Sequence, residues 1–217
     1  MFRDRTEAGK ALAKKLACYK NDASVIILGL PRGGVAVAAE VAKALHAPLD
    51  LLLVRKLGLP ENPELAMGAL ALPSTCVLND DIIKLYDVQQ ASLDRVIARE
   101  KTVLQERNAL YRENRPPPEV RGKTVILVDD GIATGADMRA ALNATKAQNP
   151  DKVIVAVPIA PEEALLPLRT QADAIFCLEK PSLFMGVGQI YENFEQVPDE
   201  TVIAFMKDAK KRQSKDN

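Results

Sequence analysis

The chain has 217 residues, of which 47% are apolar, and it carries 29 Lys and Arg against 29 Asp and Glu. This length and apolar content suit a single domain, residues 1–217, with a sizeable core and some elaborations. Zero formal charge gives no field that would attract nucleic acid or an acidic membrane, and no run reaches the ~18 apolar residues of a membrane span.

The N-terminal segment predicts a helix over residues 4–19, capped by Asp4 and apolar on one face. The N-terminus has no apolar stretch typical of a secretory leader, and the three cysteines lack paired ligand spacing. Such cysteines are expected to be small core residues in a reducing compartment, so we expect a cytoplasmic protein. The cysteines are Cys18, Cys76 and Cys177.

A glycine loop follows the first predicted strand, residues 24–30, and leads into an Ala-rich helix. Glycines before a helix leave backbone N–H groups free to bind an anion. Arg32 can add charge-assisted hydrogen bonds to a diphosphate, while Gly33 and Gly34 allow close approach of the backbone. The loop matches neither a P-loop nor a dinucleotide fingerprint, so a tight turn is the alternative interpretation. The only histidine, His46, ends the helix and is expected to face solvent.

Residues 49–58 are predicted to form one strand that ends in Arg55 and Lys56. Ligands bind at the C-terminal edge of open α/β sheets, so these cations are expected to screen phosphate charge there. A solvated strand end is the alternative. Residues 59–79 contain several Pro and Gly and predict a mobile loop followed by a small, irregular β excursion.

Residues 79–115 predict a helical insertion, in which a long amphipathic helix follows a shorter one. An apolar stripe of this length must be covered, either by the core or by a second copy in a homodimer. Packing with some dimer contact is the favoured interpretation. The stripe consists of Leu93, Val96, Ile97, Val103, Leu104, Leu110 and Tyr111.

Residues 125–138 combine several features of a sugar-phosphate site. Four apolar residues predict a buried parallel strand, and Asp129 and Asp130 follow it as acceptors for a polyol. The loop from Gly131 to Gly135 then opens a helix whose N-terminus favours a phosphate. A receiver domain also has a strand ending in two acids, but the next strand here ends in Pro158 instead of the required phosphoacceptor Asp.

At least five strands alternate with helices, which predicts an α/β fold with a mostly parallel five-stranded sheet flanked by helices. Residues 179–200 are rich in aromatic side chains, including Phe184, and indicate a C-terminal hood that could stack on a nucleobase. A small satellite core is the alternative. Residues 207–217 predict a solvated, frayed tail.

The segment VILVDDGIATGADM resembles the ribose-phosphate signature of the type I phosphoribosyltransferases: four apolar residues, two acids, a spacer and Thr-Gly. The Pro-Arg-Gly-Gly loop is similar to their pyrophosphate loop. FRDR, GLPRGG, LVRKLG followed by NPE, VDDGIATGA and YENF resemble a bacterial group of predicted phosphoribosyltransferases without an assigned acceptor. The resemblance covers roughly residues 2–205 and implies a type I fold with a helical insertion.

The resemblance also implies roles for individual residues. Asp129 and Asp130 would hold the ribose hydroxyls, and Arg32 with Gly33 and Gly34 would face the pyrophosphate, supported by Arg55 or Lys56. Mg²⁺ would be carried by the substrate, without a direct protein ligand. Phe184 is similar to the base-stacking hood residue of the hypoxanthine-guanine enzymes. The 5′-phosphate would lie on Ala133, Thr134, Gly135, Ala136 and Asp137.

Three departures from the family pattern bear on the acceptor. Asp137 stands where Thr or Ser usually contacts the phosphate, and a carboxylate there repels an anion. Ala133 replaces the acid with which the 6-oxopurine enzymes handle a purine proton, so general-base help is missing. No Lys stands near residues 157–158 to read a purine oxygen. The sequence therefore does not assign hypoxanthine or guanine.

The expected activity is transfer of ribose 5-phosphate from phosphoribosyl pyrophosphate to a nitrogenous base or similar small acceptor, with release of pyrophosphate. The transition state would resemble an oxocarbenium ion, so positioning and charge stabilisation would do most of the work. The alternative is a non-catalytic regulator that binds phosphoribosyl pyrophosphate or a nucleotide on the same fold. Asp137 and Ala133 favour this alternative, whereas the lack of a basic stripe argues against a nucleic-acid-binding regulator.

Overall fold

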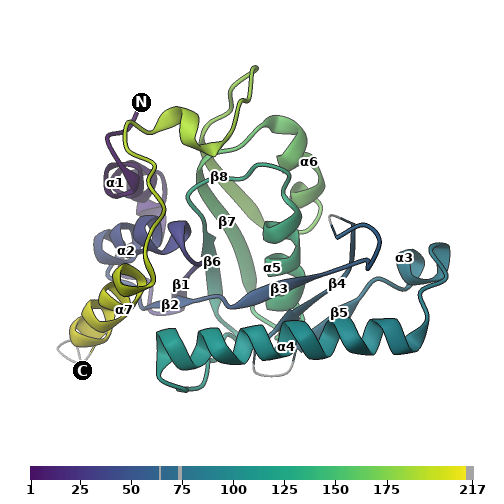
Figure 1. Cartoon of the computed structure of the whole chain (residues 1–217). Helices are drawn as coiled ribbons and strands as arrows, with labels where there is room; N and C mark the ends of the chain where they lie inside the picture. Colours follow the sequence, from purple (N-terminus) through teal and green to yellow (C-terminus); the bar gives the residue numbers. More distant parts are fainter. Residues whose placement is uncertain (64, 73–74, 214–217) are drawn as a thin grey trace.

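The computed structural model describes residues 1–63, 65–72 and 75–213 (Figure 1). The helices are α1 (Arg5–Lys15), α2 (Gly33–Leu45), α3 (Asp80–Leu85), α4 (Gln90–Arg112), α5 (Ala136–Lys146), α6 (Glu162–Arg169) and α7 (Asp199–Gln213), with short 3₁₀ turns η1 (Ala17–Tyr19) and η2 (Val187–Ile190). The strands are β1 (Val25–Gly29), β2 (Leu49–Leu51), β3 (Val54–Gly58), β4 (Ala66–Ala71), β5 (Thr75–Leu78), β6 (Thr124–Val128), β7 (Lys152–Ile159) and β8 (Ala174–Glu179).

Five of these strands form the predicted parallel sheet, in the order β2-β1-β6-β7-β8. Strands β1 and β6 are buried along their whole length because helices cover both faces of the sheet. Gly29 at the end of β1 pairs with Val128 at the end of β6. The loops after these two strands therefore start at the same level of the sheet, and the α/β prediction is confirmed.

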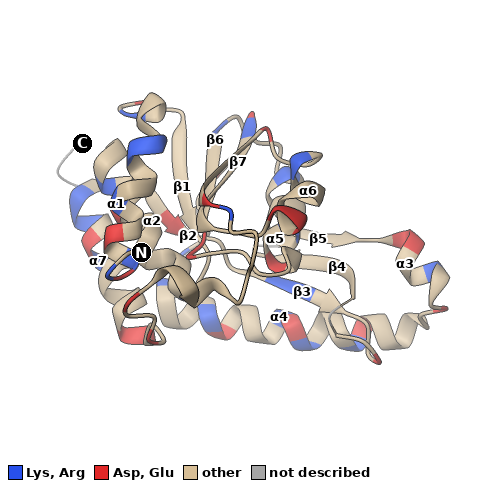
Figure 2. Cartoon of the chain, turned by 90° about the horizontal axis from the view of Figure 1, so that it is seen from above, with Lys and Arg blue, Asp and Glu red and all other residues tan. Residues whose placement is uncertain are grey.

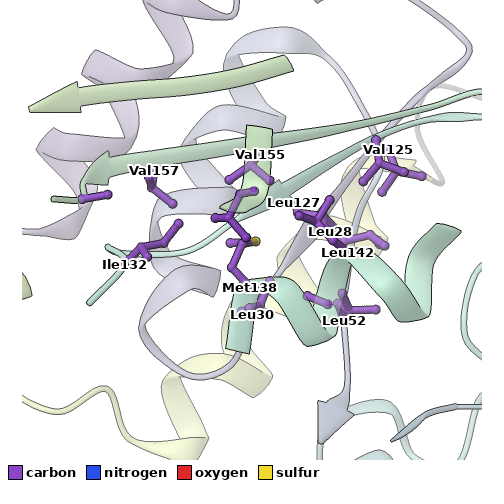
Figure 3. Close-up of a cluster of buried hydrophobic side chains, with 14 of the residues drawn as sticks. Leu28, Leu30, Leu52, Val125, Leu127, Ile132, Met138, Leu142, Val155 and Val157 are labelled. Carbon is purple, nitrogen blue, oxygen red and sulfur yellow. The ribbon is translucent and has the colours of Figure 1, made fainter. Parts of the chain in front are cut away.

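The helices that cover the parallel sheet divide between its two faces (Figure 1). On one face α1, α2 and α7 pack over Ile27, Ile126 and their neighbours. On the other face α5 and α6 pack over Leu28 and Leu127, with Met138 in the first turn of α5 inserted among the strand side chains (Figure 3). Strand alternation explains this division, since successive residues of β1 and β6 point to opposite faces.

The first predicted helix, residues 4–19, forms as α1 but ends at Lys15, and residues 17–19 form the 3₁₀ turn η1. Asp4 accepts the backbone N–H of Glu7 at 2.9 Å and so caps α1. His46 is exposed at the end of α2, as expected. The expectation of three core cysteines is wrong, because Cys18 and Cys76 are exposed and Cys177 is only half-buried.

The predicted strand over residues 49–58 is in fact two strands in different sheets, which is a correction. β2 is the edge of the parallel sheet, whereas β3 pairs antiparallel with β4, and β4 pairs with β5. Arg55 and Lys56 therefore lie in this second, three-stranded sheet and not at the C-terminal edge of the parallel one. The apolar run that crosses the junction contains no Gly or Pro, so only pairing with β4 marks the break.

The segment predicted as a mobile loop with an irregular β excursion supplies β4 and β5 of this second sheet. Glu64, Pro73 and Ser74 of that segment lie outside the described residues.

The two helices predicted for residues 79–115 are α3 and α4. Leu93, Val96, Leu104 and Tyr111 of α4 are buried against the second sheet and α7, which confirms that the stripe packs on the core. Leu110 is 46% exposed, and a homodimer through this helix stays a prediction. Acidic and basic residues are interleaved along α4 (Figure 2).

The C-terminal region is more ordered than the predicted frayed tail. Residues 207–213 belong to α7, where Met206 and Ala209 are buried against the body of the protein. Gln213 Nε2 donates to the carbonyl of Leu49 at 3.4 Å. Residues 214–217 lie outside the described residues. In the part of the chain that the structure describes, no helix has the length and apolar character to cross a membrane.

Candidate active site

Two loops from neighbouring strands meet at the C-terminal edge of the parallel sheet. Gly33 and Gly34 begin α2 after β1, while Asp129 and Asp130 follow β6. A Cβ atom added to Gly33 would lie 1.8 Å from Asp130 Oδ2, and one added to Gly34 would lie 2.8 Å from Asp129 Oδ1. The predicted pyrophosphate loop therefore touches the predicted ribose acids, and only glycine permits this approach.

Asp129 lies in an acidic environment. Its Oδ1 accepts the backbone N–H of Asp130 at 2.8 Å. Burial raises the pKa of the Asp129 carboxyl well above its ordinary value, and the negative charges of Asp130 and Asp137 raise it further. A site of this kind favours a ligand that brings hydroxyl donors or positive charge.

Arg5, the first residue of α1, reaches Asp130, and sequence reasoning missed it. Its Nε lies 2.7 Å from Asp130 Oδ2, and the two side chains are only 11% and 14% exposed. Its Nη1 donates to the carbonyl of Glu195 at 2.8 Å, and its guanidinium carbon lies 4.0 Å from the centre of the Phe194 ring. The pattern FRDR contains Arg5, but nothing in the sequence indicated its partner.

The N-terminus and the hood lie side by side at this edge. Phe2 forms a β-bridge with Tyr191, and the N–H groups of Glu192 and Asn193 donate to the carbonyls of Phe2 and Arg3 at 2.8 and 2.9 Å. The FRDR and YENF patterns noted in the sequence are thus joined in space. Their contact fixes the hood above the loop that follows β6.

Tyr191 links the hood directly to the acids. Its hydroxyl donates to the backbone carbonyl of Asp130 at 2.7 Å, and burial raises its pKa. Its ring stacks on Phe194 with centroids 5.0 Å apart. Phe184, the predicted base-stacking residue, is half-buried and packs against a small cluster that contains Ile159 and Tyr191. The hood therefore also forms the satellite core that was the alternative interpretation.

The predicted 5′-phosphate loop lies at the start of α5. Gly135 adopts φ +79°, a left-handed conformation that favours glycine, and Ala136 N–H donates to Thr134 Oγ1 at 3.4 Å. Ala133, Thr134 and Asp137 are at least partly exposed. The predicted phosphate loop therefore leads into a helix N-terminus, a position that favours an anion, although α5 carries an acid in its first turn.

Arg32 is linked to the helical insertion through α7. Its Nη1 lies 3.7 Å from Asp199 Oδ1, and the same oxygen accepts the hydroxyl of Tyr111 in α4 at 2.5 Å. Burial and the bond to Asp199 raise the pKa of Tyr111 to about 12. Neither Asp199 nor Tyr111 was predicted to contribute to the site.

The structure pairs Arg55 with a residue of α4. Its Nε lies 2.6 Å from Glu100 Oε2 in α4, and Glu100 is only 4% exposed. Lys56 points to the opposite face of β3, as strand alternation requires. Within residues 1–63, 65–72 and 75–213, no three His, Cys, Asp or Glu side chains are grouped to hold a metal ion.

Comparisons with known proteins bear on the family and the fold of the chain. The family model of the phosphoribosyl transferase domain matches residues 4–194. "Putative phosphoribosyl transferase Rv0571c" of Mycobacterium tuberculosis is 46% identical over 206 residues, which are 95% of this chain and 46% of the relative. The chain therefore spans about half the length of this curated relative.

Two solved structures extend the comparison. The crystal structure of TT1426 from Thermus thermophilus has 44% sequence identity and a TM-score of 0.88, covering 96% of this chain and 98% of that one. The hypoxanthine-guanine phosphoribosyltransferase (hpt-2) from Bacillus anthracis has 12% identity and a TM-score of 0.51, covering 88% and 89%. At that identity the second structure shares the fold alone.

Proposed function

Because the chain belongs to the phosphoribosyl transferase family, we propose that it transfers ribose 5-phosphate from phosphoribosyl pyrophosphate to a nitrogenous base or similar small acceptor. The observation that carries the proposal is the contact between the two loops, where Gly33 and Gly34 abut Asp130 and Asp129. One substrate that offers ribose hydroxyls beside a pyrophosphate would occupy both loops at once.

In the proposed reaction the bond from ribose C1 to a pyrophosphate oxygen breaks, and the acceptor nitrogen forms the new bond to C1. The leaving pyrophosphate keeps the electron pair. Asp129 and Asp130 would orient the ribose by accepting its hydroxyls, and Arg32 would support the charge that develops on pyrophosphate. Lys56 stays a candidate for the same role, whereas the bond to Glu100 makes Arg55 a weaker one.

The oxygen donors at the end of β6 suit the hard ion Mg²⁺, which we expect to bind mainly through the substrate and water. When bound it would neutralise phosphate charge beside Asp129 and Asp130. The expected cytoplasmic location and the absence of a nucleic-acid partner stay predictions that rest on composition.

Two residues bear on the acceptor and on the competing function. Ala133 offers no general base for an acceptor proton, so the acceptor should need little such help or bring its own base. Asp137 disfavours close contact with a phosphate. Both residues support the second candidate, a regulator that binds phosphoribosyl pyrophosphate or a nucleotide without turnover.

The decisive test combines turnover with binding. Pyrophosphate release would be measured with phosphoribosyl pyrophosphate, Mg²⁺ and a panel of nitrogenous bases, while calorimetry would measure binding of phosphoribosyl pyrophosphate alone. Turnover with one or more bases supports the transferase, and tight binding without turnover supports the regulator. No binding by the wild type, under conditions where its fold is intact, would overturn both.

A further inference from the structure

Arg5 sits where the three parts of the site converge. Besides its ion pair with Asp130, its Nε would lie only 3.0 Å from a Cβ atom on Gly33 in the pyrophosphate loop. Its other contacts, to the carbonyl of Glu195 and the ring of Phe194, belong to the hood. One guanidinium thus contacts an acid, abuts the glycine loop and holds the hood.

The ion pair leaves Asp130 able to bind a ligand. A carboxylate has about four acceptor positions on its two oxygens, and Arg5 Nε takes one on Oδ2. The guanidinium is also held by the Glu195 carbonyl and by the ring of Phe194. The direction in which the Asp130 carboxylate points is therefore set by groups outside its own strand.

The same contacts hold the backbone of Asp130. Tyr191 donates its hydroxyl to the Asp130 carbonyl at 2.7 Å and stacks on Phe194, which in turn lies over Arg5. The four residues form a closed ring of contacts that joins the end of β6, the start of α1 and the hood.

We infer that Arg5 is a positioning residue, which orients the Asp130 carboxylate toward a ribose hydroxyl and couples this orientation to the position of the hood. The inference rests on the proposed function, because it takes Asp130 to be a ribose acid. It gives the extreme N-terminus a part in substrate recognition, in addition to its packing on the hood.

The test compares three variants: Arg5→Gln, Arg5→Lys and the control Arg3→Gln. Arg3 lies in the same FRDR pattern, but its side chain is 76% exposed and pairs only with Glu7 among the described residues. Calorimetry would measure binding of ribose 5-phosphate and of its 2-deoxy and 3-deoxy analogues. Circular dichroism and thermal melting would verify that each variant is folded.

We expect the wild type to prefer ribose 5-phosphate over the analogue that lacks the hydroxyl facing Asp130. Arg5→Gln should weaken the binding of ribose 5-phosphate by about 10- to 100-fold, the range for a lost charged hydrogen bond. It should also abolish the preference for ribose 5-phosphate over that analogue. Arg5→Lys should retain part of this preference, because Lys keeps the positive charge but not the forked donor geometry of the guanidinium. Arg3→Gln should bind like the wild type.

Hydrogen exchange supplies a second readout. Arg5→Gln should speed exchange of the Glu192 and Asn193 amides, which bond to the N-terminal segment, while Arg3→Gln should leave them protected. If Arg5→Gln weakens the binding of ribose 5-phosphate and of both deoxy analogues equally, Arg5 only supports the fold and the inference is overturned. If the folded wild type binds neither these sugars nor phosphoribosyl pyrophosphate, the proposed function fails and the role of Arg5 falls with it. If it binds phosphoribosyl pyrophosphate but none of these sugars, only the inference about Arg5 is overturned.

Discussion

The two halves of the site are built differently. The strand-end half, formed by Gly33, Gly34, Asp129 and Asp130, is closely packed, and an added Cβ atom at either glycine would overlap an acid. The phosphate half, residues 133–137, lies at a helix start where Ala133, Thr134 and Asp137 are at least partly exposed. The chain departs from the expected family pattern in the exposed half, at Ala133 and Asp137, and keeps it in the packed half.

This contrast shows which part of the site is held in place by the fold. The strand-end half depends on the register between β1 and β6, which brings their loops to the same level. A change there must move a strand or an acid. The phosphate half would bind its anion through backbone N–H groups of a short loop, so its exposed side chains can vary without disturbing the core.

Gly33→Ala should disrupt the strand-end half and have the largest effect of the proposed substitutions. The new Cβ would lie 1.8 Å from Asp130 Oδ2, a carboxylate that its pair with Arg5 keeps from moving aside. We expect phosphoribosyl pyrophosphate binding to weaken more than about 100-fold, with a stability loss of about 1–3 kcal/mol typical of overpacking. Calorimetry and urea unfolding measure the two effects.

Gly122→Ala is the matched control for this glycine. Gly122 has φ +65° but nothing within 4 Å of an added Cβ, so the substitution strains the backbone without touching the site. It should cost about 1 kcal/mol of stability and leave binding unchanged. Normal binding by Gly33→Ala would show that the two loops do not form one site.

Asp129→Asn should change stability and binding in opposite directions: the protein should become more stable and bind its ligand more weakly. Because burial and Asp130 raise the folded-state pKa of Asp129, the folded protein holds this proton more tightly than the unfolded chain does. Stability is then lost as pH rises above the ordinary carboxyl pKa toward the raised one, so ionised Asp129 destabilises the ligand-free protein at neutral pH.

We therefore expect Asp129→Asn to raise the melting temperature at pH 7 and to flatten its dependence on pH above about 4, while ribose 5-phosphate binding falls about 10-fold or more. Scanning calorimetry across pH and binding titrations check both effects. A lower melting temperature of Asp129→Asn at pH 7 would contradict the explanation that ionised Asp129 destabilises the ligand-free protein.

Asp137→Thr tests the phosphate half. The substitution removes a carboxylate from the first turn of α5 and supplies a hydroxyl, so it should tighten the binding of phosphoribosyl pyrophosphate. We expect a gain of only about 3- to 10-fold, because solvent screens the repulsion at this partly exposed position. The gain should shrink at about 1 M salt. Weaker binding would show that Asp137 contributes to the site in another way.

Tyr111→Phe should have the smallest effect. It removes the bond to Asp199 and should cost about 1 kcal/mol of stability while changing pyrophosphate affinity less than about 3-fold. The raised pKa of about 12 keeps the folded phenol protonated, so its stability contribution falls only as pH rises above about 10, through 12. Urea unfolding at pH 7 and pyrophosphate titration test this, and a larger loss of affinity would make the insertion part of the site.

Much of the fold could be predicted because hydrophobic periodicity is local. Buried strands, the Asp4-capped helix and the long amphipathic helix follow from patterns within single elements. The division of residues 49–58 between two sheets could not be predicted, since the apolar run has no break and only the distant partner β4 decides it. For the same reason the fate of Arg55 depended on Glu100, 45 residues away.

Local patterns in the sequence indicated the residue types of the candidate site: two acids after a strand and two glycine-bearing loops before helices, at one edge of a predicted parallel sheet. The groups that surround those acids are visible only in the folded structure. Arg5 and Asp130 are 125 residues apart, and Tyr191 and Asp130 are 61 apart. Their contacts form because the first helix and the hood pack together over the strand ends, an arrangement set by long-range packing that no local pattern records.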